Sequence, residues 1–166
     1  MIKMMWENIF RVRGKDKSNI INVLKSVPIF KDLNFSEMKK LKKIIHQRNY
    51  DIDEYVFKFD TPGLGMYILI DGEIEIQNKT KGGTVKVVNL YKGDFFGELS
   101  LVSDENRTVE AIAKTKCELV AFFRTDLINL IKRSPKLGNK ILMNLSWVLG
   151  QRLRELNKLN QIFEND

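Results

Sequence analysis

The chain has 166 residues, of which 43% are hydrophobic and 30% charged, and a net charge of +7. This size and composition are typical of a single globular domain with one core, and no apolar run approaches the 18 or so residues that a membrane span requires. The single Cys117 cannot form an internal disulfide, and the N-terminus lacks the features of a signal peptide, so we expect a cytoplasmic protein without a transmembrane segment.

The positive charge is concentrated near the N-terminus. Residues 1–44 contain 11 Lys/Arg and 4 Asp/Glu, whereas residues 45–166 contain 17 of each. Such a basic segment could bind an acidic protein, anionic lipid or nucleic acid. The alternative is a helical surface that is only solvated.

Helical patterns open the chain. Apolar residues spaced by three and four predict a first helix that ends near Gly14, and Ser18 is a suitable N-cap for a second helix that Pro28 terminates. Asn34 and Glu37 have the spacing of a capping box at the start of a third. Three helices are therefore expected before the first strand.

From about Arg48 the pattern changes to short runs rich in Tyr, Val, Ile and Phe, separated by turns such as Asp71-Gly72 and Gly82-Gly83. We predict antiparallel strands over residues 55–59, 66–70, 73–78, 84–90, 107–113 and 117–123. This pattern indicates a mainly β, α+β protein, an antiparallel β jelly-roll barrel flanked by N-terminal helices and a long C-terminal helix. We divide it into a helical segment 1–26, a β-barrel domain 27–133 and the C-terminal helix 134–166.

The last helix, expected from Ser134-Pro135 onward, has a heptad-like seam. Its members are Leu142, Leu145, Leu149, Arg152, Leu156, Leu159 and Phe163. We expect part of this seam to form a parallel homodimer, in which Arg152 reaches a carboxylate such as the partner's Glu155. The alternative is a seam packed wholly within one chain.

The most informative stretch runs from Phe95 to Thr108. A strand that breaks at Gly97 into one helical turn leaves backbone N–H groups unpaired, and such a turn binds anions. If Arg107 returns beside it, a small space holds N–H donors, a planar cation, the Thr108 hydroxyl and the Glu98 carboxylate. Because the carboxylate repels a bare phosphate but accepts from sugar hydroxyls, phosphate plus ribose satisfies this set.

These residues resemble the cyclic-nucleotide-binding domain family of catabolite activators, kinase regulatory subunits and gated channels. The resemblance lies in the phosphate-binding cassette, here Phe96-Gly97-Glu98-Leu99-Ser100-Leu101 followed by Arg107-Thr108-Val109, and in the hairpin from Gly65 to Ile76 and the entry segment from Val27 to Leu33. It covers residues 27 to about 160.

The resemblance implies roles for individual residues. Gly97 and Ser100, on either side of Glu98 and Leu99, would offer backbone N–H groups to the phosphate of cAMP or cGMP. Arg107 would pair with its charge, Thr108 would add a hydroxyl and Glu98 would accept from the ribose 2′-OH. The alternative is a local Glu98–Arg107 ion pair in an empty site.

Recognition of the base is less well defined. Val87 and Ile74 would form an apolar wall against it, or they are ordinary core residues. A Thr-Ser pair that touches adenine in the catabolite activators corresponds here to Leu156 and Asn157, so the preference between cAMP and cGMP stays open.

We find no pattern of catalytic residues and expect no enzyme and no metal. His46 is the only histidine, and we predict it at the end of a helix on the surface.

Two hypotheses follow. The first is a regulatory sensor that binds a cyclic nucleotide and relays occupancy through the C-terminal helix to a partner protein or its own dimer. The second is an interaction module that keeps the fold without the ligand and acts through its basic N-terminal helix on a partner or a membrane surface. Since no helix-turn-helix follows the long helix, we expect no direct sequence-specific DNA binding.

Overall fold

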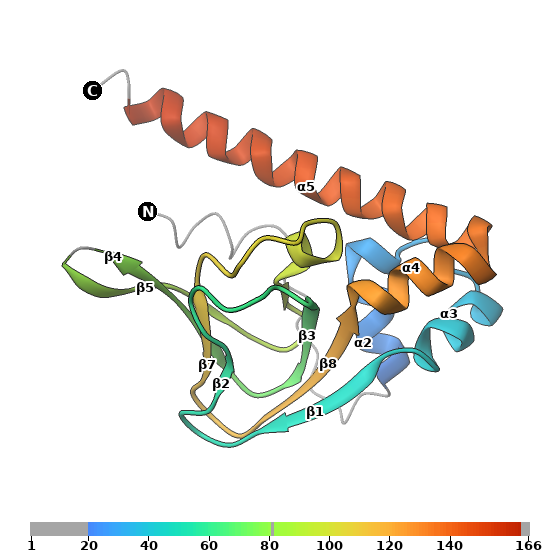
Figure 1. The fold of residues 1–166 in the computed structure, drawn as a ribbon, viewed down its shortest axis with the longest axis horizontal. Coiled ribbons are helices and arrows are strands. Elements are labelled where there is room, and N and C mark those ends of the chain that lie inside the picture. Colours follow the sequence, from blue (N-terminus) through green and yellow to red (C-terminus); the bar gives the residue numbers. More distant parts are fainter. Residues whose placement is uncertain (1–19, 81, 164–166) are drawn as a thin grey trace.

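Two four-stranded antiparallel sheets and the helices that cover one of their ends make up the protein (Figure 1). The structure is a computed structural model that describes residues 20–80 and 82–163. The predicted first helix lies outside the described residues, as does Ser18, the predicted N-cap of the second. Mainly β, α+β architecture is confirmed.

Short helices precede the sheets, as predicted. They are α2 (Ile20–Ser26), the 3₁₀ turn η1 (Pro28–Phe30) and α3 (Phe35–Lys42). Pro28 ends the first of them because its ring cannot continue a helix. The capping box is present: the Asn34 side chain accepts from Glu37 N at 3.0 Å, and Asn34 N donates to the Glu37 carboxylate at 2.8 Å.

The strands pair in two sheets. One has the order β1 (His46–Tyr50), β8 (Cys117–Phe123), β3 (Gly65–Asp71) and β6 (Phe95–Phe96). The other has the order β2 (Tyr55–Phe57), β7 (Glu110–Ala113), β4 (Ile74–Thr80) and β5 (Gly83–Leu90). All predicted strands are found: β8 has the predicted bounds, and the others have shifted ends. The ladders between the described strands form two sheets, not one closed barrel.

Two strands were not predicted. His46 begins β1 and does not end a helix; its ring contacts Phe123 and its Nε2 lies 3.1 Å from the Asp126 carboxylate. The two-residue strand β6 is too short for any pattern. Helix α4 (Arg124–Arg133) has Phe123 as its N-cap, and the Asp126 side chain accepts from Phe123 N at 3.1 Å.

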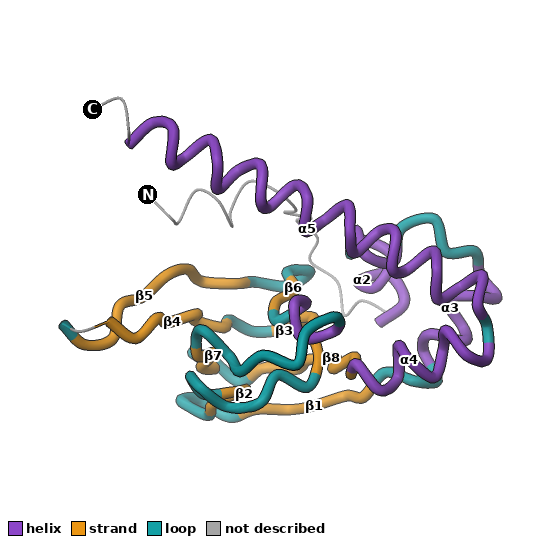
Figure 2. The backbone as a smooth tube through the Cα atoms, turned by 45° about the horizontal axis from the view of Figure 1, so that its top comes forward, coloured by secondary structure: helices purple, strands orange, loops and turns teal. Residues whose placement is uncertain are grey.

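Two hydrophobic clusters form the interior. The first lies between the sheet that contains β3 and the helices, and includes Phe30, Met38, Leu41, Phe122, Leu127 and Leu130. The second lies between the two sheets, and includes Tyr67, Leu69, Ile74, Val88, Phe96 and Leu119. The tube in Figure 2 shows the helices gathered beside the strands, with the last helix running past both.

Helix α5 (Pro135–Phe163) is the last and longest element. Its first half belongs to the chain's own core: Leu145 is buried there, and Leu142 and Leu149 pack against the same cluster. These residues begin the seam that we assigned to a dimer, so the first half of the seam is packed in cis. In the second half, Leu153 and Leu156 are exposed.

Polar contacts fix the first half of α5. The buried Asn144 amide donates to Ile29 O at 3.3 Å and to Lys31 O at 3.0 Å, and the Lys140 ammonium contacts the Glu37 carboxylate at 2.8 Å. Among the described residues, neither α5 nor any other helix has the length and apolar character needed to cross a bilayer.

Candidate functional site

The turn after β6 is built around Gly97. This residue has φ +74°, in the left-handed region that glycine adopts without strain, and it caps the 3₁₀ turn η2 (Glu98–Leu101). The first bond inside the turn runs from Ser100 N to Gly97 O at 3.2 Å. The N–H groups of Glu98 and Leu99 therefore come before Ser100, whose N–H is the first donor bonded within the turn, and this is the arrangement expected of an anion site.

Arg107 lies beneath this turn and is only 7% exposed. Its Nη2 donates to Gly65 O at 2.7 Å, and its Nη1 donates to Ser100 Oγ at 2.8 Å and to Gly97 O at 3.3 Å. Gly97 must lack a side chain here, because a Cβ would lie 2.5 Å from Arg107 Nη1. The guanidinium therefore ties together the turn, strand β3 and the segment before β7.

All of these acceptors are neutral. Among the described residues no carboxylate forms an ion pair with Arg107, and its buried Nε has no hydrogen-bond partner. Burial lowers the pKa of the guanidinium below its usual value, an effect that Tyr67 and Glu98 partly oppose. A buried cation without an anion is costly, and a bound anion would relieve that cost.

Aromatic rings pack on the other side of the Arg107 guanidinium. The guanidinium carbon lies 4.1 Å from the Phe57 ring centre and 5.9 Å from that of Tyr67. Phe57, Tyr67 and Phe96 pack on one another with centroids 5.6 to 5.9 Å apart. These ring faces supply partial compensation for the cation and fix its plane.

Glu98 is not paired with Arg107. Its carboxylate, only 3% exposed, forms an ion pair with Arg152 Nη1 of α5, and the Arg152 guanidinium lies over the Phe95 ring at 5.0 Å. The predicted contact of Arg152 with the partner's Glu155 is thus replaced by a contact within the chain. The local Glu98–Arg107 ion pair, our alternative, is not formed.

Sequence reasoning therefore missed Arg152 as a site residue. The one available signal was an arginine in an otherwise leucine-rich seam, which marks a position where the helix meets a charge. Sequence spacing alone does not reveal that this charge is 54 positions upstream.

The other predicted residues lie at different depths. Ser100 is buried beside Arg107, whereas Leu99 and Thr108 are exposed at the rim. Ile74 is fully buried in the cluster between the sheets. Val87 packs against that cluster and is the extra residue of a bulge, since Ile76 pairs with Val88 and Gln77 with Lys86; such a bulge redirects the side chain.

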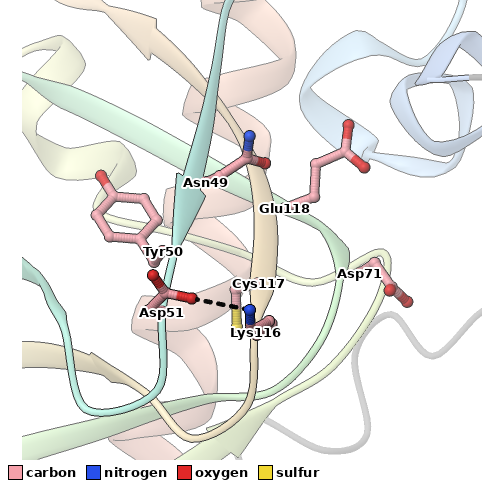
Figure 3. Close-up of a pocket in the computed structure, with 7 residues that line it drawn as sticks. All are labelled: Asn49, Tyr50, Asp51, Asp71, Lys116, Cys117 and Glu118. Atoms are coloured by element: carbon pink, nitrogen blue, oxygen red, sulfur yellow. Dashed lines mark ion pairs between the residues drawn. The ribbon is translucent and has the colours of Figure 1, made fainter.

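A separate cavity of about 360 Å³ lies near the junction of β1, β8 and the β3–β4 turn (Figure 3). Asp51 and Lys116 form an ion pair of 3.4 Å there, and the carboxylates of Asp51, Asp71 and Glu118 point in different directions. Burial raises the pKa of Tyr50 to about 12, so this phenol stays neutral. Within the described part of the chain, no group of three His, Cys, Asp or Glu side chains is placed to hold a metal ion.

Comparison with known proteins decides the family. The family model described as "Cyclic nucleotide-binding domain" matches residues 47–134, which include the whole cassette. The chain belongs to this family. The resemblance drawn from Phe96 to Val109 is thereby confirmed.

Two relatives of this cyclic nucleotide-binding domain carry cyclic AMP in their names. The chain is 30% identical to a cyclic AMP receptor protein of Thermus thermophilus over 133 residues, which are 80% of this chain and 60% of that protein. It is 29% identical to the cAMP-dependent protein kinase regulatory subunit of Schizosaccharomyces pombe, over 81% of this chain but only 32% of that subunit.

The fold is matched as well. The crystal structure of the Thermus thermophilus catabolite activator protein has a TM-score of 0.74 and 28% identity, and the match covers 82% of this chain and 63% of that one. The cyclic nucleotide-binding domain described here thus spans less than two thirds of the first relatives that it matches.

Gly97→Ala tests the geometry of the turn. We expect a loss of stability of roughly 1 to 2 kcal/mol for a left-handed alanine, and a displaced Arg107 because of the 2.5 Å approach to its Nη1. Urea denaturation measures the first effect. Gly82→Ala is the control, because its Cβ would meet only Thr80 Oγ1 at 3.9 Å; equal loss of stability in both variants would contradict the assigned role of Gly97.

Proposed function

We propose that the protein binds a cyclic mononucleotide, cAMP or cGMP, at the η2 turn and relays occupancy through α5. The observation that carries this proposal is the charge distribution of the site. Arg107 is a buried cation with only neutral acceptors, while the nearby carboxylate Glu98 is already neutralised by Arg152. One negative charge is missing, and the phosphate of a cyclic nucleotide carries one.

The turn supplies the remaining contacts. A phosphate above Arg107 would also accept from the early N–H groups of η2, where Glu98 and Leu99 precede the first intrahelical bond. Arg152 engages Glu98 through Oε1, which leaves Oε2 for a ribose hydroxyl. Gly97, which has no side chain, would let the phosphate approach the backbone closely. The Ser100 hydroxyl accepts from Arg107 and orients it, and Thr108 lies exposed at the rim of the site.

The base would lie toward the sheets. The half-buried Val87, redirected by the bulge, is the better placed of the two predicted wall residues, because Ile74 is fully enclosed by other side chains. Leu156 and Asn157 stand where the related activators have hydroxyls, and Thr108 resembles cassettes that accept cyclic GMP. We therefore propose no adenine-specific contact and leave the choice of base to titration.

The relay depends on the ion pair between Glu98 and Arg152. This ion pair links the cassette to the second half of α5, beyond the part of the helix that Asn144 fixes. A ribose hydroxyl that donates to Glu98 shares the carboxylate with Arg152 and weakens their ion pair, so the position of α5 responds to the ligand.

We also propose a fold type, a protein class and a domain division for the chain. The order of strands in the two sheets supports the jelly-roll interpretation. We propose a non-enzymatic, cytoplasmic regulator whose parts are residues 1–26, 27–133 and 134–166. The nucleotide-free alternative relies on the segment 1–26, most of which lies outside the described residues; titration with cAMP and cGMP distinguishes the two.

Arg107→Ala tests the phosphate contact. Losing one desolvated charge pair typically costs about 2 to 5 kcal/mol, so we expect affinity for cAMP or cGMP to fall roughly thirtyfold or more. Arg107→Lys should bind with intermediate affinity, because an ammonium keeps the charge but not the paired donors. Isothermal titration calorimetry measures both. Unchanged binding by Arg107→Ala would refute the assigned role.

Glu98→Gln tests the sugar contact. We expect it to weaken a ligand with a free 2′-OH and to affect the 2′-deoxy analogue much less, because the lost acceptor serves only that hydroxyl. Isothermal titration calorimetry of the wild type and the variant with both ligands gives the loss of affinity for each ligand. Equal losses for the two ligands would mean that Glu98 acts only by holding Arg152.

The homodimer is proposed for the second half of α5, where Leu153 is 59% and Leu156 is 44% exposed. We expect the wild-type chain to sediment as a dimer and Leu156→Asp, at a member of the seam, to sediment as a monomer, since a carboxylate would be buried between the two helices. Met143→Asp, at a 71% exposed position on another side of α5, is the control. A wild-type chain that stays monomeric at high concentration would contradict the dimer.

A further inference from the structure

A basic surface covers the end of the molecule where α3, α4 and the start of α5 meet. We name it the helix-end surface and define it by seven exposed residues: Lys39, Lys40, Lys42, Lys43, Lys132, Arg133 and Lys136. In Figure 1 these elements lie together at the right of the molecule, away from the β4–β5 hairpin. None of these seven residues belongs to the N-terminal segment 1–19.

Contacts on two sides hold α3 in this position. Lys140 of α5 binds Glu37 in the first turn of α3, and His46, just after α3, contacts Asp126 in the first turn of α4 at 3.1 Å. Met38 of α3 belongs to the same core cluster as residues of α4 and α5. The seven basic side chains are therefore held on one rigid end, not on a flexible tail.

The charges of this surface are not compensated within the described chain. None of the seven residues forms an ion pair with a described carboxylate, and the nearby Glu37 and Asp126 are engaged by Lys140 and His46. The C-termini of α3 and α4 favour lysines in their last turns. That explanation does not extend to Lys136, which lies in the first turn of α5 and faces the opposite end of a helix dipole.

Two large apolar side chains are exposed on the same helices. Phe35 is 63% exposed at the start of α3, and Ile128 is 43% exposed on α4. Each is followed by a lysine four positions later, on the same side of its helix; Lys39 Nζ lies 4.4 Å from the centre of the Phe35 ring. Exposed apolar groups next to lysines are typical of a protein surface that binds a membrane interface.

We propose that the helix-end surface binds the surface of an anionic lipid bilayer. Six of its seven cations are lysines, which act as point charges and suit a diffuse negative surface better than the paired geometry that arginine gives to single phosphates. Phe35 and Ile128 add apolar contacts at headgroup depth. Nucleic acid would gain from an aromatic ring by stacking but nothing from an aliphatic Ile128.

The proposed lipid binding does not depend on the proposed nucleotide binding. The cassette turn η2 packs against strand β3, and none of the cassette residues belongs to the helix-end surface, so bilayer binding through α3 and α4 uses different residues from nucleotide binding. Cyclic nucleotide binding and lipid binding are thus expected to be compatible in one molecule.

Vesicle co-sedimentation of the full chain tests the proposal. The chain should bind vesicles of phosphatidylcholine with phosphatidylserine, should not bind phosphatidylcholine alone, and should be released by salt. In the double variant Lys40→Gln with Lys43→Gln, affinity should fall roughly thirtyfold, because each lysine near an anionic bilayer contributes about a fivefold factor. Phe35→Ser should reduce the binding that remains at high salt.

The control is a second double variant with the same net charge as the first. Lys58→Gln with Lys116→Gln removes two exposed lysines from the sheet side and should change lipid affinity by less than about threefold. Equal lipid binding by the two double variants, no binding by the wild type, or tighter binding to a DNA duplex than to these vesicles at equal phosphate concentration would each overturn the proposal. Both double variants should keep wild-type affinity for cyclic nucleotide, so a failure of lipid binding is distinguishable from a failure of the proposed site.

Discussion

The buried guanidinium of Arg107 is the interaction on which the site depends. Its three acceptors, Gly65 O, Gly97 O and Ser100 Oγ, come from two separate stretches of chain, strand β3 and the η2 turn, and are all neutral. A cation at this depth tolerates such surroundings only if every neighbouring group is arranged around it. The left-handed Gly97, the aromatic rings and the burial of Ser100 follow from that requirement.

A second arginine completes the charge balance. Arg152 reaches from α5 to neutralise Glu98, so the carboxylate that lies nearest the turn does not neutralise Arg107. Two cations and one carboxylate leave the site with a positive charge in a region of low dielectric, where attraction for an anion is strong. Because one of the two cations belongs to α5, the charge of the site and the position of the helix depend on each other.

Local sequence signals predicted the parts of the fold that local chemistry determines. The capping box of Asn34, the stop at Pro28 and the strands with β-branched residues are examples. Strand β1 was missed because His46 to Tyr50 carries no apolar alternation and becomes a strand only through its pairing with β8. The cassette was predictable because its residues are contiguous. The partner of Glu98 was not, because contacts between distant segments leave no periodic pattern in the sequence.

The contact between Glu98 and Arg152 also determines how short the domain can be made. A chain cut after α4 would keep every strand and the whole cassette but would leave a carboxylate, only 3% exposed, without its counter-ion. It would also expose the core side chains that the first half of α5 covers, such as Leu145. The smallest autonomous folding unit must therefore extend beyond position 152, which makes α5 an integral part of the domain and not an appendage to it.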